Sequence, residues 1–487
     1  MVEDMVNLIG CCELREGGHP NPVSNFPAQI LFTAQILLLP QWRNSAQSAS
    51  IFLRNFWFVI CLVNCTSDHM VRTFFRKLLT YLSSSEDSDD DLNEDVEGQC
   101  IRKRRKFIRR DHIQGHECLY RDYFAENPVY SANLFRRRFR MSRPLFLRIL
   151  NEVVANEPYF VQRRDNAGRL GLSSMQKIIA SLRMLAYGVT TDFMDEYIDI
   201  GESTAMESLK KFCETIVSIF SAEYLRSPNT KDITRLLAIA DQRGFPGMLG
   251  SIDCMHWKWK NCPTAWKGMY IGHIREPTII LEAVASYDLW IWHAFFGMPG
   301  SLNDINVLER SSIFTELEQG CAPPVNYTVN GHDYTMGYYL ADGIYPKCQT
   351  FVKTIPSPRG DKNKHFAKAQ ESARKDVERA FGVLQQRFAI IRGPSRMFKA
   401  KVLTSIMKAC VILHNMIIED ERDDDDNLNI ESAPDDQLDD DLPELSRTHT
   451  IEIMDFIQRR LHIRDSLAHH QLQEDLIEHQ WLRFSQH

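Results

Sequence analysis

The stretch Gly250-Ser251-Ile252-Asp253-Cys254-Met255-His256-Trp257-Lys258-Trp259 decides the fold prediction. Ile252 and Cys254 flank Asp253 in period two, and two tryptophans, which favour strands, follow. This pattern predicts a half-buried strand that presents Asp253 from a rigid element. Further acidic residues stand downstream in contexts that could bring them to the same place: Asp304, Asp342 and Glu378.

Strand-like and loop-like segments alternate from Gly250 to about residue 390. We expect strands over residues 251–259, 278–286, 290–297, 338–341 and 350–355, and helices over residues 305–312 and about 367–388. This order predicts an α/β fold, a ribonuclease-H-like mixed sheet with flanking helices. In such a sheet the middle of the first strand and the end of the fourth lie side by side, so Asp253 and Asp342 would face each other.

The long helix expected over about 367–388 carries Glu378. Its apolar residues recur at helical spacing and predict a stripe that packs on the sheet: Val377, Phe381, Leu384 and Phe388. Because Glu378 adjoins this stripe, we expect it at the border of the buried face. There a carboxylate can reach a metal ion without being stranded in the core.

The region before the sheet, residues 128–235, predicts an all-α, helix-turn-helix-like arrangement. Ser142 is expected to cap one helix at its N-terminus. Three helices with tight turns follow, from Ser174 to Gly188, over about 192–198, and from about 203 to 219 after Gly201. The third would be the DNA-reading helix. Its basic residues are only Lys210 and Lys211, so a plain helical bundle is an equal alternative.

The remaining segments differ from this central part in composition. Residues 1–82 form an N-terminal extension to which we assign no function, and 83–127 an acidic and then basic disordered linker. Seven of the ten residues from 101 to 110 are basic, which indicates a nuclear-import signal, a phosphate-binding arm or a solvated charge run. After the nuclease-like domain, 245–418, we expect an acidic flexible segment, 419–447, and a C-terminal amphipathic helix, 448–487, that docks on the protein or on a partner.

Composition limits the class of protein. A chain of 487 residues is too long for one ordinary domain, and 44% hydrophobic residues suffice for a core. The net charge of -7 hides segregated acidic and basic segments. Twelve cysteines without a C-x-x-C pair favour a reduced, intracellular compartment. The longest uninterrupted apolar run near the N-terminus, residues 56–63, is far shorter than the ~20 residues of a membrane helix, so no membrane association is expected.

The four acidic residues suggest metal chemistry. Mg²⁺ and Mn²⁺ prefer oxygen ligands, and two such ions can clamp the attacking water and the leaving oxygen of a phosphodiester. Spacing alone is weak evidence, because a chain with 64 acidic residues yields many such sets. On spacing alone, ordinary surface carboxylates would be the better explanation.

The sequence around each acidic residue is more specific. Four motifs occur in order: Gly-Ser-Ile-Asp-Cys-Met-His at 250–256, Gly-Ser-Leu-Asn-Asp at 300–304, Leu-Ala-Asp-Gly-Ile-Tyr-Pro at 340–346, and Val-Glu-Arg-Ala-Phe-Gly-Val-Leu at 377–384. Together they resemble the DDE nuclease domain of PIF/Harbinger transposases. The group includes Harbinger transposase-derived nucleases and plant relatives of the antagonist-of-like-heterochromatin kind. The resemblance runs from about residue 134 to 418.

The resemblance implies acidic metal ligands at Asp253, Asp304, Asp342 and Glu378, holding Mg²⁺ or Mn²⁺. The predicted fold makes Asp253, Asp342 and Glu378 the catalytic trio. Asp304 precedes a helix, so it is either a ligand or an N-cap without a metal role. The implied activity is hydrolysis of DNA phosphodiester bonds.

The resemblance also implies partners and a location. DNA is the expected substrate, the nucleus the expected compartment, and a separate Myb-like DNA-binding protein the expected partner. The main alternative is a domesticated transposase that binds DNA or chromatin without cutting it. A helical DNA-binding regulator without chemistry would leave the four ordered motifs unexplained.

Residues around the acidic set could hold DNA. His256 could contact a phosphate, although a packed strand histidine is commoner. Trp257, Trp259 and Trp266 could stack on bases, with core packing expected for at least two of them. Basic residues that could contact the DNA backbone are Lys258, Lys260, Lys267, Arg275, Lys362, Lys364, His365 and Lys368.

Overall fold

The computed structural model describes residues 108, 110–312, 325–426 and 466–486, all of which lie in the unit Arg102–His487. The predictions for residues 1–82, for most of the acidic and basic linker, and for residues 427–465 lie outside the described residues.

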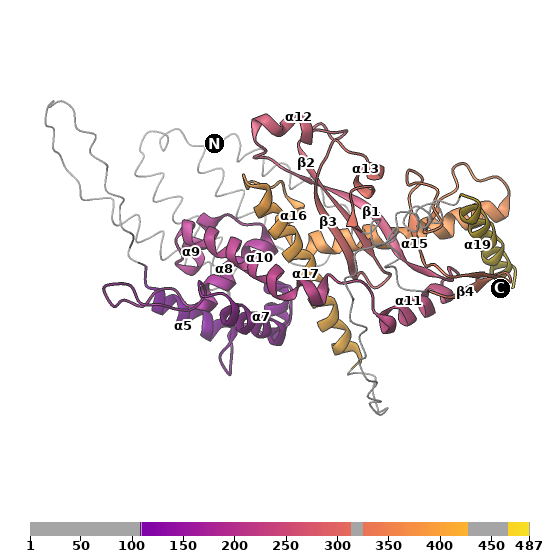
Figure 1. Ribbon diagram of the computed structural model, residues 1–487. Helices are drawn as coiled ribbons and strands as arrows, with labels where there is room; N and C mark the ends of the chain where they lie inside the picture. Colours follow the sequence, from indigo (N-terminus) through magenta and orange to yellow (C-terminus); the bar gives the residue numbers. More distant parts are fainter. Residues whose placement is uncertain (1–107, 109, 313–324, 427–465, 487) are drawn as a thin grey trace, which may run out of the picture. The chain divides into compact units, whose positions relative to one another are not determined.

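A five-stranded mixed sheet is the centre of this unit (Figure 1). Its strand order is β3-β2-β1-β6-β7, with bounds β1 Met248–Lys258, β2 Thr278–Ala285, β3 Ile291–Pro299, β6 Tyr338–Ala341 and β7 Phe351–Lys353. The first three strands pair antiparallel, and β6 and β7 run parallel to β1. The predicted mixed sheet with flanking helices is therefore confirmed. Two short strands in a separate hairpin, β4 Tyr327–Val329 and β5 His332–Tyr334, were not predicted.

The register of β1 with β6 places the first and third predicted acidic residues. Ser251 of β1 pairs with Leu340 of β6 in the parallel ladder. Asp253 and Asp342 each follow two residues later, so they stand at the same level on neighbouring strands, Asp342 just past the end of β6. Parallel pairing, not sequence proximity, brings them together.

Helix α15, Asp361–Arg387, packs along β1 and carries Glu378. The predicted apolar stripe is confirmed, because Val377, Phe381, Leu384 and the following Phe388 are all buried. The helix begins six residues before the predicted start, directly after Gly360, whose φ of 79° interrupts the preceding chain. On the other side of the sheet, α13, Asp304–Leu308, is shorter than predicted. A short turn of helix, η2 Thr264–Trp266 and α12 Lys267–Tyr270, follows β1.

Seven helices precede the sheet in the described chain: α5 His112–Tyr123, α6 Ala132–Phe139, α7 Arg143–Asn156, α8 Ser174–Tyr187, α9 Thr191–Ile198, α10 Glu202–Tyr224 and α11 Thr230–Gln242. Residues at the ends of these helices explain where two of them begin or stop. Ser142 accepts a hydrogen bond from the Leu145 N–H at 3.3 Å, as expected of an N-cap, and Gly188 ends α8 with φ 64°. Helix α5 contradicts the predicted disordered linker to residue 127, because Leu119 and Tyr123 are buried apolar anchors.

Helix α10, the predicted DNA-reading helix, is a core helix. It packs against α8 and α17, Ala400–Asp426, and its buried face includes Phe212, Cys213 and Ile216. The described residues that α10 exposes include Glu202, Glu207 and Glu214, whereas Lys210 and Lys211 are half-buried. An acidic exposed face would repel a phosphate backbone. The alternative of a helical bundle fits this helix better.

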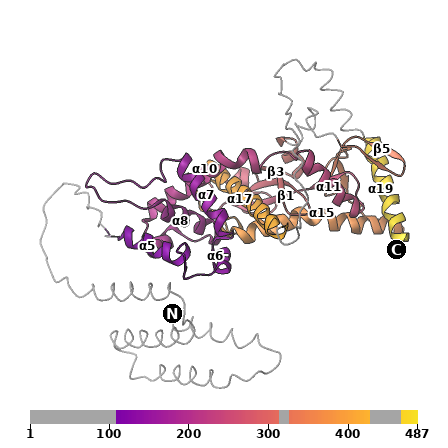
Figure 2. The same ribbon diagram turned by 90° about the horizontal axis from the view of Figure 1, so that it is seen from below.

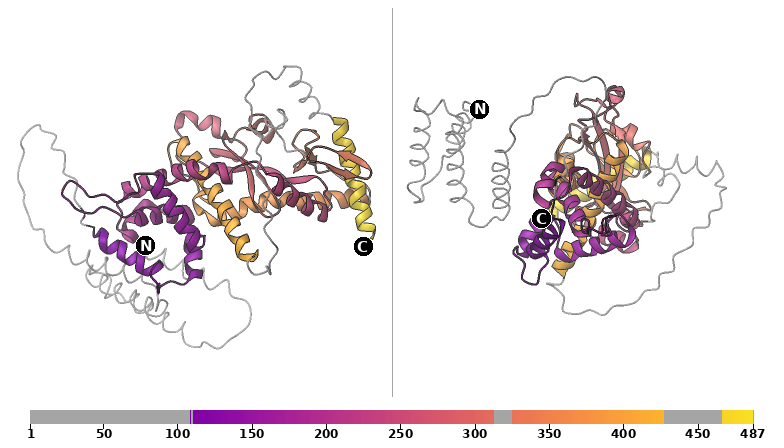
Figure 3. Two further views of the ribbon diagram at one scale, coloured as in Figure 1. Left: turned by 60° about the horizontal axis from the view of Figure 1, so that its bottom comes forward. Right: turned by 90° about the vertical axis from the view of Figure 1, so that its left-hand side faces the viewer.

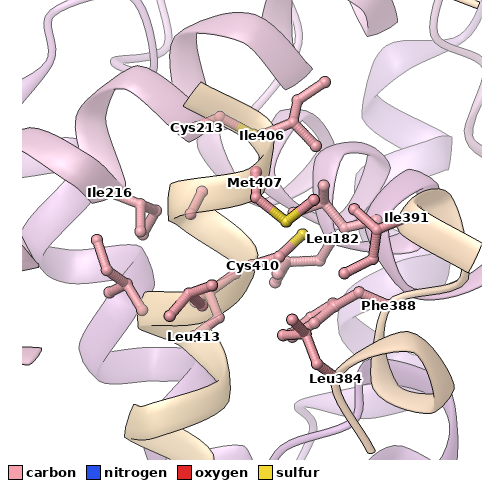
Figure 4. Packing of buried hydrophobic residues seen from close by; sticks show 14 of the residues in the cluster. Leu182, Cys213, Ile216, Leu384, Phe388, Ile391, Ile406, Met407, Cys410 and Leu413 are labelled. Atoms are coloured by element: carbon pink, nitrogen blue, oxygen red, sulfur yellow. The ribbon is translucent and has the colours of Figure 1, made fainter. Parts of the chain in front are cut away.

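The hydrophobic core is continuous from the helices to the sheet. Figure 4 shows side chains of α8, α10, α15 and α17, with α16 Ala389–Arg392, meeting around Met407, Cys410 and Leu413. Helix α17 is long and apolar enough to cross a membrane, but 72% of its apolar window is buried inside the protein, as in a core helix.

The end of α17 corrects the predicted flexible segment from residue 419. The helix continues through Asp426, because acidic side chains beyond Ile418 are held by partners in other helices. Asp420 accepts a hydrogen bond from Ser142 at 2.9 Å, Glu421 pairs with Arg387, and Glu419 bonds with Tyr224. These contacts anchor what would otherwise be a solvated charge run.

The C-terminal helix α19, Ser466–Gln486, docks on the protein itself (Figures 2 and 3). It packs against α15 and the β4–β5 hairpin. Asp475 accepts hydrogen bonds from the Tyr334 hydroxyl at 2.5 Å and contacts His332 at 2.9 Å. Gln480 donates to the Gly244 carbonyl at 2.7 Å. Of the two predicted docking modes, the described residues show the intramolecular one.

Candidate active site

Asp253 lies in the middle of β1 with 21% of its side chain exposed. Its Oδ1 accepts a hydrogen bond from the Cys254 N–H at 2.8 Å, and its Oδ2 lies 3.4 Å from Arg374 Nη1. The pKa of Asp253 is raised to about 6, mainly by burial. The hydrogen bond from the Cys254 N–H and the charge of Arg374 oppose the rise, and the charges of Asp304 and Glu378 add to it. The carboxylate therefore sits where a cation would be favourable.

Arg374 of α15 joins Asp253 to Glu378. Its Nη2 lies 2.9 Å from Glu378 Oε1 and 3.0 Å from Glu371 Oε1, which are its neighbours at i+4 and i−3 on the helix. The guanidinium side chain is only 10% exposed, whereas that of Glu378 is 43% exposed. Glu378 thus lies at the border of the buried face, as predicted. Sequence reasoning missed that Arg374 links two of the acidic residues.

Asp342 follows β6 in an exposed turn. Its Oδ1 accepts a hydrogen bond from the Gly343 N–H, and its carbonyl accepts one from the Tyr345 N–H at 3.2 Å. These bonds fold the chain back at the end of the strand. The Asp342 charge raises the pKa of Asp304, so the two carboxylates interact.

Asp304 is the first residue of α13, and Asn303 is the N-cap. The Asn303 side chain accepts the Asn306 N–H at 2.9 Å. The alternative of an Asp304 N-cap is therefore wrong. Burial is the main cause that raises the pKa of Asp304. The Cys254 thiol donates a hydrogen bond to Asp304 and lowers this pKa, whereas the charges of Asp342 and Glu282 raise it. Its carboxylate is turned to these groups, not to the helix N-terminus.

The two faces of β1 divide the acidic residues. Ser251, Asp253 and Met255 face α15, as shown by the Ser251 hydroxyl donating to the Ala373 carbonyl at 3.4 Å. Cys254 faces the other side, where its Sγ lies 3.8 Å from the Tyr345 hydroxyl. Asp253 and Glu378 thus share the α15 face, and Asp304 reaches the same strand from the α13 side.

Glu282 is a further acidic residue that sequence reasoning missed. It lies opposite Cys254 on β2, is completely buried, and neither carboxylate oxygen accepts a hydrogen bond from the described residues. His293 Nε2, on β3, lies 3.4 Å from Glu282 Oε1 and 3.0 Å from Ser311 Oγ, just after α13. The signal was one charge inside the apolar run Thr-Ile-Ile-Leu-Glu-Ala-Val-Ala, a pattern in which a buried carboxylate needs a function or a partner.

The predicted site residues have the donor type that a hard divalent cation takes. They are carboxylates, the oxygen ligands that Mg²⁺ and Mn²⁺ prefer, and burial raises the pKa of two of them. In the described part of the chain, no group of three or more His, Cys, Asp or Glu side chains is placed so that it could hold a metal ion. Instead Arg374 supplies the positive charge between Asp253 and Glu378.

The other predicted contact residues have varied surroundings. His256 Nδ1 lies 3.0 Å from Thr278 Oγ1, a strand–strand contact. Trp257 and Trp259 are buried and donate to the carbonyls of Gly393 at 2.9 Å and Met397 at 2.7 Å, whereas Trp266 is 44% exposed. Core packing for two of the tryptophans is confirmed.

Among the predicted backbone-contact residues, several have partners within the chain. Lys258 pairs with Glu276 at 2.7 Å, Lys362 pairs with Glu478 at 2.6 Å, and the His365 ring lies 4.4 Å from that of Phe484. Lys260, Lys267, Arg275, Lys364 and Lys368 are exposed.

Comparisons with known proteins agree with the family that the four motifs indicate. Residues 222–425 match the family of plant transposon proteins, and residues 115–154 match a domain of unknown function. The chain is 25% identical to the Arabidopsis thaliana "Protein ALP1-like" over 61% of this chain and 73% of that protein. It is 22% identical to the human "Putative nuclease HARBI1", over 51% and 68% of the two chains, and 22% identical to its mouse counterpart, over 54% and 71%. No solved structure matches the chain significantly. The resemblance found in the sequence is thereby confirmed.

Proposed function

We propose that this chain, a Harbinger-like transposase-derived protein, is a divalent-metal-dependent DNA endonuclease that hydrolyses phosphodiester bonds. The observation that supports it most is the convergence of carboxylates from distant segments. Asp253 and Asp342 stand at the same level of two adjacent parallel strands. Arg374 contacts both Asp253 and Glu378 and so links these two carboxylates. The sheet and its helices are compatible with the ribonuclease-H-like fold that the resemblance implies.

In this proposal Asp253, Asp342 and Glu378 hold the cation, and Asp304 is a fourth ligand. A bound Mg²⁺ or Mn²⁺ would supply Lewis acidity toward the phosphodiester and lower the pKa of its water. Asp253 presents its carboxylate from a strand paired on both sides, which limits its movement. Asn303 fixes the start of α13 and thereby the position of Asp304.

Arg374 is a positioning residue here. It restrains Asp253 and Glu378 in one orientation and offsets their mutual repulsion. Because its side chain is almost buried, it cannot easily turn away to solvent. Glu371 shares the same guanidinium and keeps Arg374 in place.

The substrate, compartment and partner follow from the same proposal. DNA is the substrate, the nucleus the compartment, and a Myb-like DNA-binding protein a partner. The names of the matched relatives agree with a nuclease of transposase origin. A pull-down from nuclear extract with a tagged chain would identify the partner, and imaging of the tagged chain would test the compartment.

The test is plasmid nicking by the purified chain with Mg²⁺ or Mn²⁺. Asp253→Ala and Glu378→Ala should abolish metal-dependent nicking. Asp361→Ala, which removes an exposed carboxylate from the start of the same helix α15, should leave it unchanged. DNA binding without nicking, equal in all variants, would instead indicate a domesticated DNA- or chromatin-binding protein.

A further inference from the structure

A second charged feature lies away from the carboxylates, in a pocket of about 410 Å³ formed by α6, the C-terminal end of α15 and α17. Four arginines line it, Arg136, Arg137 and Arg140 from α6 and its cap and Arg387 from α15. Of the described residues that line the pocket, only Val383 is apolar. Pockets for drug-sized ligands are mostly apolar, so this lining suits a charged, hydrated group.

The pocket has more positive than negative charge. Glu421 of α17 bonds to Arg387 and lies 3.7 Å from Arg136. It is the one carboxylate among the described lining residues, against four guanidinium groups. Arg137 is exposed, and Arg140 Nε is buried without a hydrogen-bond partner among the described residues. A buried donor without an acceptor is unfavourable, and an incoming anion would supply the missing acceptor.

Only some arginines of the basic segment 136–148 line the pocket; others make contacts within the fold. Six arginines and no acidic residue occur between residues 136 and 148. Arg138 lies 3.8 Å from the centre of the Tyr130 ring and donates to the Tyr123 hydroxyl at 2.6 Å. Arg148 donates to the Tyr224 hydroxyl at 3.0 Å. These two stabilise the fold. Of the lining arginines, Arg140 also lies 5.2 Å from the centre of the Tyr187 ring, and all of them converge with Arg387, far away in sequence.

The pocket and the carboxylate site are on different sides of α15. Arg387 follows Glu378 by nine residues, which is about 14 Å along the helix and about half a turn around it. A strand bound at the carboxylates would therefore not enter this pocket through the same contacts. The pocket would hold another part of a long polyanion.

We infer that the pocket binds phosphate groups of a DNA backbone, outside the segment that reaches the carboxylates; the choice of DNA rests on the proposed function. Guanidinium groups match phosphate oxygens with paired hydrogen bonds. The sparse apolar lining gives no place for an acyl chain or for an apolar peptide side chain. Contacts of this kind position DNA without reading its sequence.

The test is binding of a fluorescent 30-base-pair duplex to the full chain in EDTA, over a range of NaCl concentrations. Arg137→Gln and the double variant with Arg140→Gln should weaken binding at every duplex sequence. Each lost phosphate contact should lower the magnitude of the log–log salt slope by about 0.9. Arg169→Gln, which removes an exposed arginine between α7 and α8, is the matched control and should bind as the unmodified chain does.

The outcomes separate this inference from the nuclease proposal. Arg137 is exposed, so Arg137→Gln should not disturb folding. Unchanged affinity and salt slope in this variant would overturn the inference that the pocket binds DNA, whether or not the chain nicks DNA. Absence of DNA binding by the unmodified chain would overturn it too. Weaker binding by the pocket variants would support it even if no metal-dependent nicking is found, because the assay contains no metal.

Discussion

Replacing Arg374 with glutamine removes the guanidinium that lies between Asp253 and Glu378. Breaking a buried ion pair costs about 3–5 kcal/mol, because it leaves a buried charge without a partner. Asp253 is 21% exposed, but Glu378 and Glu371 are 43% and 39% exposed, so water screens part of the loss. We therefore expect Arg374→Gln to lower the free energy of unfolding by about 2–3 kcal/mol in EDTA.

A divalent cation should reverse much of that loss. In the unmodified chain a cation must compete with Arg374 for the carboxylates, whereas in the variant it meets an uncompensated pair. A cation at about 100 times its dissociation constant stabilises the folded state by about 2.7 kcal/mol. The gain in stability on adding Mg²⁺ should thus be larger in the variant than in the unmodified chain.

Urea unfolding, followed by circular dichroism in EDTA and in saturating Mg²⁺, measures both quantities. Arg379→Gln is the matched control on the same helix, because Arg379 is 57% exposed and its partner Asp376 keeps Arg243. It should change stability by less than about 1 kcal/mol, independently of Mg²⁺. Equal destabilisation of Arg374→Gln in EDTA and in Mg²⁺ would refute the reasoning, since it would mean that no cation replaces the guanidinium.

Three further expectations concern other buried polar groups. Glu282→Gln should stabilise the protein by about 1 kcal/mol in urea unfolding at pH 7, because it removes a buried carboxyl group that accepts no hydrogen bond from the described residues; a loss of stability would show that the contact with His293, at 3.4 Å, outweighs the cost of burial. Burial, with Arg387 adjacent, lowers the pKa of His414 to about 3, so the unfolded chain alone takes up a proton as pH falls below about 6.5. Stability should fall by about 2 kcal/mol from pH 7 to pH 5, and His414→Gln should remove that part of the pH dependence. Asp475→Asn should weaken the contact of α19 with Tyr334 and speed amide hydrogen exchange in α19, and unchanged exchange would contradict this anchor.

The sequence predicted the parts of the fold that follow local periodicity. The apolar stripe at Val377, Phe381 and Leu384 states which side of the helix is buried, and the structure agrees. The strand around Asp253 is correct in position but is not half-buried, because Ile252 is buried on one face and Met255 on the other. The short hairpin β4–β5 was missed because three-residue strands carry too few residues to show a period. Its stability comes from contacts with α19, far along the chain.

Predictions failed where distant partners decide the outcome. The acidic residues after Ile418 have the composition of a solvated segment, yet they extend α17 because Ser142, Tyr224 and Arg387 meet them. The third helix of the expected helix-turn-helix was correct in position but is a core helix, because its faces are set by α17. Neither set of contacts can be predicted from composition alone.

The sequence named the acidic residues of the candidate site but not the contacts that join them. Sequence motifs selected Asp253, Asp304, Asp342 and Glu378. The roles of Arg374 and Asn303 depend on the directions of their side chains, which the sequence does not give. Glu282 could have been found as a lone charge in an apolar strand, but nothing in the sequence placed it beside Cys254.

Binding of Mn²⁺, measured from the electron paramagnetic resonance signal of the free ion, tests most directly whether carboxylates from β1, β6 and α15 form one cation site. The unmodified chain should bind Mn²⁺, and Asp253→Asn and Asp342→Asn should each weaken binding more than about tenfold, or about 1.4 kcal/mol. Asp361→Asn, at an exposed position of α15, should bind as the unmodified chain does. Equal Mn²⁺ affinity in the unmodified chain, Asp253→Asn and Asp342→Asn would contradict the account.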